Sequence, residues 1–170
     1  MSDKKISNSI LQKLSKQIEG DFYFDHISKV LYATDASAYR EMPLAVALPK
    51  SKIDVQNLIR FANDHKCSLI PRGAGTSLAG QVVGSGIVVD FSKYLNHIIE
   101  VNTDEKWVRV EPGVVLSELN IHLQKYGLMF GPETSTANRC TMGGMLGNNS
   151  CGLHSLIHGS VREHILDVTA

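Results

Sequence analysis

Three stretches of the chain carry hydrophobic residues at the three- to four-residue spacing of an amphipathic helix, and they cover residues 6–18, 51–65 and 115–127. Ser51 and Asp54 at the start of the second stretch resemble the capping pair of a helix N-terminus. These patterns predict three helices.

Shorter apolar or alternating runs predict β-strands between these helices. The runs cover residues 44–48, 68–70, 86–91, 97–101 and 107–111. The first two flank the second helix, so they predict a β-α-β unit with a right-handed crossover. Residues 21–42 show no sustained period and are expected to be irregular, and residues 128–130 predict a short strand or extended segment. We expect the first 130 residues to form one α/β layer structure.

Small and polar residues dominate after Gly131, up to about Val161. Residues 165–168 then show the apolar character of a further strand. Because the sequence stops at Ala170, just after this strand, we expect a domain that is incomplete at its C-terminus.

The composition is that of one globular domain of 170 residues, with 43% hydrophobic and 20% charged residues. Basic and acidic residues number 17 each, which removes the usual electrostatic argument for a nucleic-acid partner. Three cysteines far apart in sequence indicate no disulfide framework, so a reducing compartment fits best. The polar N-terminus indicates neither a signal peptide nor a membrane span, so we expect a cytoplasmic protein.

A glycine-rich run at residues 71–81 directly follows a predicted strand. Its glycines permit positive φ, so successive main-chain N–H groups can converge on an anion, and Thr76 and Ser77 add hydroxyl donors. A phosphate or pyrophosphate is the natural ligand, with a tight structural turn as the alternative. The nucleoside-triphosphate loop motif fails at Gln81, where lysine is required, and the dinucleotide fingerprint fails at Leu78, where its third glycine would stand.

A second predicted loop, with little side-chain bulk and many hydrogen-bond donors, comprises residues 131–133 and 141–152. A small-residue helix packed tightly against a sheet is the structural alternative for this run. Two such regions in one chain favour a long ligand that contacts both. A nucleotide- or anion-binding module without redox function, and an interaction domain whose glycine loops only pack, remain competing hypotheses.

Other reactive residue types give weaker signals. His154 and His158 have helical spacing, but no glutamate lies between them as in zinc proteases, so we expect ordinary loop or surface histidines and no metal site. Cys140 and Cys151 flank the second glycine region without a base partner fixed by spacing, so we expect no catalytic thiol. No catalytic residue is assigned within this chain.

Five blocks, in this order and spacing, resemble the FAD-binding domain of FAD-linked oxidases of the p-cresol methylhydroxylase and vanillyl-alcohol oxidase type. They are residues 71–81, 87–91, 111–113, 131–133 and 141–152. The resemblance extends from about Leu31 onward and is nearest to the branch of D-lactate, glycolate and D-2-hydroxyglutarate dehydrogenases. It implies an α+β fold with two α/β lobes, the second truncated. It also implies an N-terminal helix and irregular segment at residues 1–42 before an FAD-binding domain at 43–170.

The same resemblance implies a set of FAD-binding residues. Gly73, Ala74, Gly75, Thr76 and Ser77 would surround the pyrophosphate, while Arg72 would either contact the cofactor or brace the loop. Further contacts would come from Pro132, Glu133, Thr141, Gly143, Gly144, Gly147, Asn148, Ser150 and Gly152. Some relatives join a histidine of the first loop covalently to the flavin, but residues 73–77 contain none, so non-covalent FAD is expected.

The implied function is the FAD-binding portion of an enzyme that oxidises a D-2-hydroxy acid by hydride transfer to flavin. The substrate pocket, and in some relatives an iron–sulfur domain, would belong to a downstream region. We therefore expect the isolated chain to turn over no hydroxy acid. We also expect missing strands to favour weak FAD retention or association with a second copy.

Overall fold

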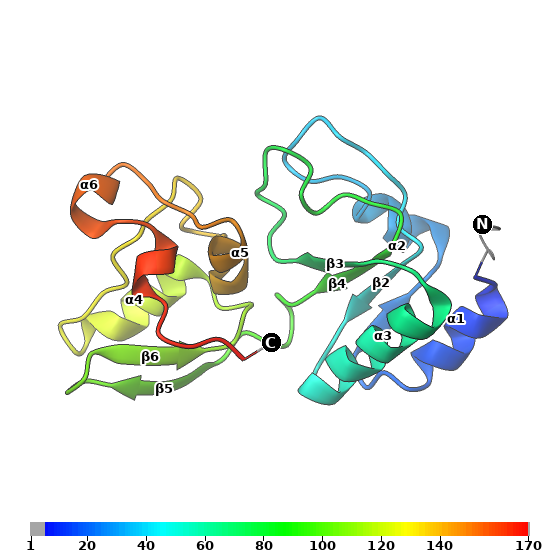
Figure 1. The fold of residues 1–170 in the computed structure, drawn as a ribbon, viewed down its shortest axis with the longest axis horizontal. Helices are drawn as coiled ribbons and strands as arrows, with labels where there is room; N and C mark the ends of the chain where they lie inside the picture. Colours follow the sequence, from blue (N-terminus) through cyan, green and yellow to red (C-terminus); the bar gives the residue numbers. More distant parts are fainter. Residues whose placement is uncertain (1–5, 170) are drawn as a thin grey trace. The chain divides into compact units, whose positions relative to one another are not determined.

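The computed structural model describes residues 6–169, which form two compact units that divide between Leu95 and Asn96 (Figure 1). One α/β layer over the first 130 residues is therefore a wrong prediction, because strands β5 (Ile98–Asn102) and β6 (Trp107–Val110) belong to the second unit. Two units agree with the predicted two lobes. No helix within residues 6–169 is long and apolar enough to cross a membrane.

A four-stranded sheet forms the centre of the first unit, in the order β1-β2-β4-β3. Its strands are β1 (Asp21–Tyr23), β2 (Ala45–Leu48), β3 (Leu69–Arg72) and β4 (Ile87–Asp90). The strands β2, β4 and β3 run parallel, and β1 is an antiparallel edge strand in which Phe22 lies opposite Ala47. Every residue of β2 and β4 is buried, as expected for apolar strands at the centre of a parallel sheet.

Helices α1 (Asn8–Ser15) and α3 (Lys52–His65) pack on this sheet through one buried cluster. Leu11, Leu14 and Leu58 share that cluster with apolar residues of β2 and β4. Both helices were predicted from their hydrophobic spacing, and the structure confirms them. Helix α3 connects β2 to β3 as the predicted β-α-β unit, with β4 lying between the two strands.

The expectation of irregular chain over residues 21–42 is wrong in part, because β1 and α2 (His26–Leu31) form there. A strand of three residues and a helix of six are too short for a hydrophobic period to show. Asp25 stabilises the start of α2 by accepting a hydrogen bond from the Ser28 N–H at 2.9 Å. The chain after α2 is irregular as expected, apart from an isolated bridge between Thr34 and Arg40.

Asp54 in the first turn of α3 connects two segments of the first unit, the chain just before β1 and the chain just before α3. The Asp54 N–H donates to the Ser51 hydroxyl at 3.3 Å, which confirms Ser51 as the helix cap. The Asp54 carboxylate accepts hydrogen bonds of 2.8 to 3.0 Å from the main-chain N–H groups of Glu19, Gly20 and Lys50. The residue is only 2% exposed, so this carboxylate is a structural acceptor.

Replacing Asp54 by alanine should lower the free energy of unfolding by about 2 kcal/mol, because three main-chain donors lose a charged acceptor. Chemical denaturation followed by circular dichroism measures the change. Asp64→Ala is the matched control, since Asp64 is an exposed acid of the same helix, and its effect should stay within about 0.5 kcal/mol. Equal effects of the two substitutions would contradict the structural role of Asp54.

The second unit combines the antiparallel pair β5 and β6 with short helices. These are α4 (Leu116–Gln124), α5 (Met142–Gly147), α6 (Ser155–His158) and the 3-10 helix η1 (Val161–His164). A two-stranded ribbon has only marginal stability in water unless it packs against other elements. Val101 and Val108 of the ribbon pack against a buried cluster that includes Leu119, Met145 and Val161.

Two expectations for the second unit are wrong. Residues 165–168 form no strand among the described residues, because apolar character makes a strand only where a pairing partner is present. Residues 141–152 are not one continuous loop, since 142–147 form helix α5. Residues 128–130, predicted as a short strand or extended segment, form no strand, and the Phe130 N–H donates to the Asn120 side chain at 2.7 Å.

Candidate functional site

The first group of candidate residues begins where β3 ends, at Arg72, and continues through the loop at residues 73–81. The carboxyl end of a parallel strand is the usual position of ligand-binding loops in open α/β sheets. Gly75 and Gly80 adopt φ values of +66° and +75°, which confirms the expected use of positive φ in this run. Residues with a Cβ atom rarely adopt this conformation.

The loop offers main-chain donors that the protein does not use. Among the hydrogen bonds of residues 6–169, none involves the N–H groups of residues 74–77. Further along, the Ala79 N–H donates to the Gln81 side chain at 3.2 Å, and the Gln81 N–H donates to the Ser77 hydroxyl at 3.3 Å. Gln81 therefore closes the end of the loop by hydrogen bonding within it. Consecutive free N–H groups are a suitable donor set for a phosphate.

The residues just before β2 hold this loop. The Ala36 N–H donates to the Gly75 carbonyl at 3.0 Å, and Nη1 of Arg72 donates to the Thr34 carbonyl at 2.8 Å. Figure 1 shows the two segments side by side, in cyan and green. The sequence indicated only a polar run here and gave no sign of these contacts.

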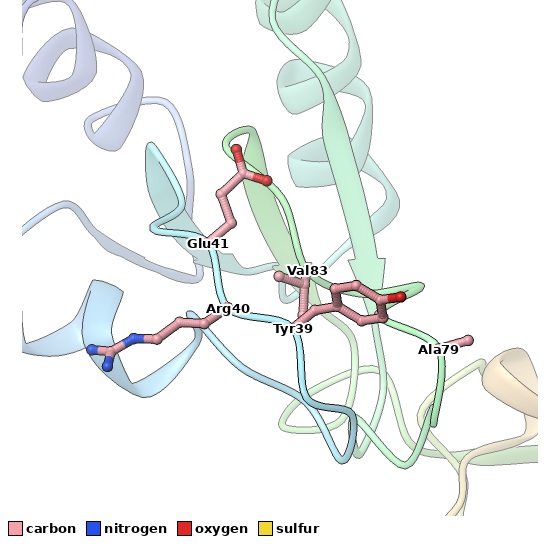
Figure 2. A pocket seen from close by; sticks show the side chains of 6 residues that line it. Tyr39, Arg40, Glu41, Ala79 and Val83 are labelled. Carbon is pink, nitrogen blue, oxygen red and sulfur yellow. The ribbon is translucent and has the colours of Figure 1, made fainter.

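A small cavity of about 210 Å³ lies between the same two segments (Figure 2). Its lining residues are Tyr39, Arg40, Glu41, Ala79, Gly80 and Val83. A Cβ atom on Gly80 would lie 2.8 Å from the Tyr39 ring, so the glycine permits this close approach. The volume is below the usual range for sites that enclose a small molecule, and none of the predicted site residues lines it.

Asp90 at the end of β4 follows the glycine loop at about the sequence spacing of a ribose-binding acid in the dinucleotide fold, but its hydrogen bonds are structural. Its carboxylate accepts hydrogen bonds from the Tyr32 hydroxyl at 2.7 Å and from the Ser92 N–H and hydroxyl at 2.8 and 2.7 Å. Asp90 is 7% exposed. Burial, followed by the Asp90 carboxylate, raises the pKa of the Tyr32 phenol well above its ordinary value, so it remains a donor.

The second group of candidate residues centres on α5 in the other unit. Thr141 caps this helix by accepting a hydrogen bond from the Gly144 N–H at 3.4 Å. A Cβ atom on Gly143 would lie 2.7 Å from the side chain of Pro112, so this glycine allows close packing. The structural alternative is therefore right that a small-residue helix forms at the start of this run, but the close contact of Gly143 is with Pro112 and not with a strand. Gly144, Gly147 and Asn148 are exposed and accessible to a ligand.

The segment at 131–133 meets the end of the same run. A Cβ atom on Gly152 would lie 2.1 Å from the Glu133 carbonyl oxygen, so only glycine allows this approach. A Glu133 carboxylate oxygen lies 2.5 Å from Nδ1 of His154. The Ser150 N–H donates to the Met145 carbonyl at 2.9 Å, which folds the chain after α5 back on the helix. Pro132 is buried and Glu133 half-buried.

The remaining reactive residues form no further centre. Among residues 6–169, no group of three or more His, Cys, Asp or Glu side chains could hold a metal ion. Cys140 is buried and Cys151 exposed. Burial raises the pKa of the Cys67 thiol, which makes it a poor nucleophile. Nε2 of His164 donates to the His158 carbonyl at 2.6 Å.

Comparison with known families distinguishes between the alternatives for the two glycine regions. The family described as FAD binding domain matches residues 43–170. The chain belongs to this FAD-binding domain family. This match supports FAD as the cofactor, and it favours FAD binding over an anion-binding module without redox function.

Two relatives illustrate how much of a longer protein this FAD-binding domain represents. D-2-hydroxyglutarate dehydrogenase of Escherichia coli (strain K12) is 41% identical over 166 residues, which are 95% of this chain and 16% of that protein. Glycolate oxidase subunit GlcD of Bacillus subtilis (strain 168) is 30% identical over 155 residues, 88% of this chain and 33% of that protein. The chain thus spans well under two thirds of either relative.

Solved structures confirm the predicted fold class. An alkyldihydroxyacetonephosphate synthase matches with a TM-score of 0.82 at 20% identity, over 93% of this chain and 32% of that chain. A p-cresol methylhydroxylase matches with a TM-score of 0.69 at 19% identity, over 83% of this chain and 28% of that chain. The FAD-binding domain therefore has the fold of the p-cresol methylhydroxylase type.

The residues of the first loop fit a diphosphate. A pyrophosphate carries several acceptor oxygens, and residues 74–77 present main-chain donors that bind nothing else in the described chain. Gly73 and Gly75 leave the main chain uncovered by bulky side chains. The donor set therefore suits FAD without a dense basic patch.

Proposed function

We propose that this chain is the FAD-binding part of a flavin-dependent dehydrogenase that oxidises a D-2-hydroxy acid of the D-lactate, glycolate or D-2-hydroxyglutarate class. The observation that carries the proposal is the set of unused main-chain donors at residues 74–77, in a chain 41% identical to a D-2-hydroxyglutarate dehydrogenase. Glycolate oxidase and D-lactate dehydrogenase relatives support the same class of substrate.

In the first unit, we assign the pyrophosphate to the loop after β3. Gly73, Ala74, Gly75, Thr76 and Ser77 bind it through main-chain N–H groups, with the Thr76 hydroxyl as a further donor. The absence of histidine from residues 73–77 supports non-covalent binding at this loop. Arg72 supports the loop rather than the cofactor, because its Nη1 donates to the Thr34 carbonyl.

In the second unit, we assign contacts with the rest of the cofactor to residues around α5. Gly144, Gly147 and Asn148 are exposed and contact it directly, and we assign further contacts to the half-buried Glu133 and Ser150. Thr141, Gly143, Pro132 and Gly152 hold these residues in place through capping and close packing.

The chemistry that FAD supplies when bound is acceptance of a hydride equivalent from the substrate carbon. The residues of this chain hold and orient the cofactor. We place the substrate-contacting residues, and the iron–sulfur domain that some relatives carry, in the part of the protein outside this chain. The proposal includes association of the isolated chain with another copy, which would remove exposed apolar side chains such as Leu156 and Leu166 from water.

Titration of the purified chain with FAD tests the proposal, with the visible spectrum of flavin as the signal. We expect saturable one-to-one binding, and ADP should compete weakly because it lacks the flavin and ribityl groups. In an activity assay with an electron-accepting dye, the FAD-loaded chain should not reduce the dye when D-2-hydroxyglutarate, D-lactate or glycolate is added. The full-length protein should oxidise one of these three acids. Equal affinity for ADP and FAD would favour the anion-binding alternative.

A further inference from the structure

We propose that Arg72 is a positioning residue that fastens the FAD-binding loop to the segment at residues 32–41, which precedes the family match at 43–170. The inference deepens the proposed function and rests on it for its effect on FAD. The contacts themselves belong to the first unit and can be tested without cofactor.

The Arg72 guanidinium lies between the loop and the 32–41 segment. Nη1 donates to the Thr34 carbonyl at 2.8 Å, and the central carbon of the guanidinium lies 5.3 Å from the centre of the Tyr32 ring. A Cβ atom on Gly75 would lie 2.6 Å from Nη2, so the loop main chain packs directly on the guanidinium. Arg72 thus fixes the position of Gly75 by packing against its main chain.

The 32–41 segment is itself held by hydrogen bonds. The Glu41 N–H donates to the Ala33 carbonyl at 2.9 Å, and the Ser37 N–H donates to the Asp35 carboxylate at 2.8 Å. The hydroxyl of Tyr32 donates to the buried Asp90 at the end of β4. The surface on which Arg72 packs is therefore anchored to the central sheet.

The positive charge of Arg72 acts on the carboxylate of Asp35 in the same unit. One carboxylate oxygen of Asp35 is buried and has no hydrogen-bond partner among the described residues. Burial raises the pKa of the Asp35 carboxyl, but hydrogen bonding to Ser37 and the charge of Arg72 lower it, and the pKa lies below its ordinary value. An ionised Asp35 therefore balances Arg72 and favours a structural role over direct cofactor binding.

The test compares Arg72→Lys with Arg60→Lys, the same chemical change at an exposed position of α3. Lysine keeps the charge but lacks the planar fork that bonds Thr34 and packs beneath Gly75. We expect Arg72→Lys to weaken FAD binding at least tenfold. In the protein without FAD, we expect hydrogen exchange of the Ala36 N–H, which donates to Gly75, to speed up at least tenfold. Arg60→Lys should change neither quantity.

Two variants separate the outcomes. If Arg72 bound the cofactor directly, Arg72→Met would weaken FAD binding more than Arg72→Lys does. Neither variant would then change the hydrogen exchange of the Ala36 N–H. That result would overturn the inference. Unchanged exchange and unchanged affinity in Arg72→Lys would overturn it as well, while leaving FAD binding intact. Faster exchange in a chain that binds no FAD would support the loop contacts and refute the proposed function instead.

Discussion

Replacing Gly75 by alanine should weaken FAD binding about a hundredfold. The φ value of +66° costs a residue with a Cβ atom about 1–2 kcal/mol. The added Cβ atom would also lie 2.6 Å from Nη2 of Arg72, so either the guanidinium or the loop must move. Both changes displace the donors at residues 74–77. FAD titration of the variant measures the loss.

Gly127→Ala is the matched control for this substitution. Gly127 has nearly the same backbone conformation, with φ of +68°, but an added Cβ atom would meet nothing within 4 Å. It follows α4 and lies outside the predicted cofactor contacts. The affinity of the Gly127→Ala variant for FAD should equal that of the unmodified protein. Equal losses in both variants would show that general destabilisation, and not the loop, governs FAD binding.

Replacing Gly152 by alanine should also weaken FAD binding about a hundredfold. The added Cβ atom would lie 2.1 Å from the Glu133 carbonyl oxygen, a main-chain atom that cannot turn away as a side chain can. The segment at 131–133 must then separate from the chain that follows α5, and overpacking of this kind typically costs 1–3 kcal/mol. Isothermal titration calorimetry with FAD measures the loss.

Leu153→Ala serves as the control for Gly152→Ala. The leucine is the next residue in sequence and is 88% exposed, so its truncation removes little packing. FAD affinity should stay within about twofold of the unmodified protein. Retention of full affinity by Gly152→Ala would refute the role that we assign to the contact between Gly152 and Glu133.

The central elements of the fold could be predicted because their patterns are local. The strands β2 and β4 are continuous apolar runs, and α3 combines a capping serine with a helical period, so neighbouring residues suffice to define them. Helix α5 was predicted only as the structural alternative for its run, because glycine is a poor helix former, although the capping Thr141 was a usable signal. The short elements β1 and α2 owe their stability to tertiary contacts that spacing does not reveal.

The same distinction applies to the candidate site. The glycine loop at 73–81 was visible because its residue types are unusual and contiguous. For Arg72 the sequence left open whether it contacts the cofactor or braces the loop, because its hydrogen bond reaches the Thr34 carbonyl, 38 residues earlier in the chain. A main-chain carbonyl carries no side-chain signature, so nothing in the sequence marks Thr34 as a partner. Such long-range contacts require the structure.

The most direct test of the account is an NMR titration of the isotopically labelled chain with FAD, observed through the main-chain amides. We predict that the amides of residues 74–77 and those of residues 144–152 both shift, and that both sets saturate with one dissociation constant. Shifts confined to one set, or two different dissociation constants, would contradict the claim that the two glycine regions bind a single FAD molecule.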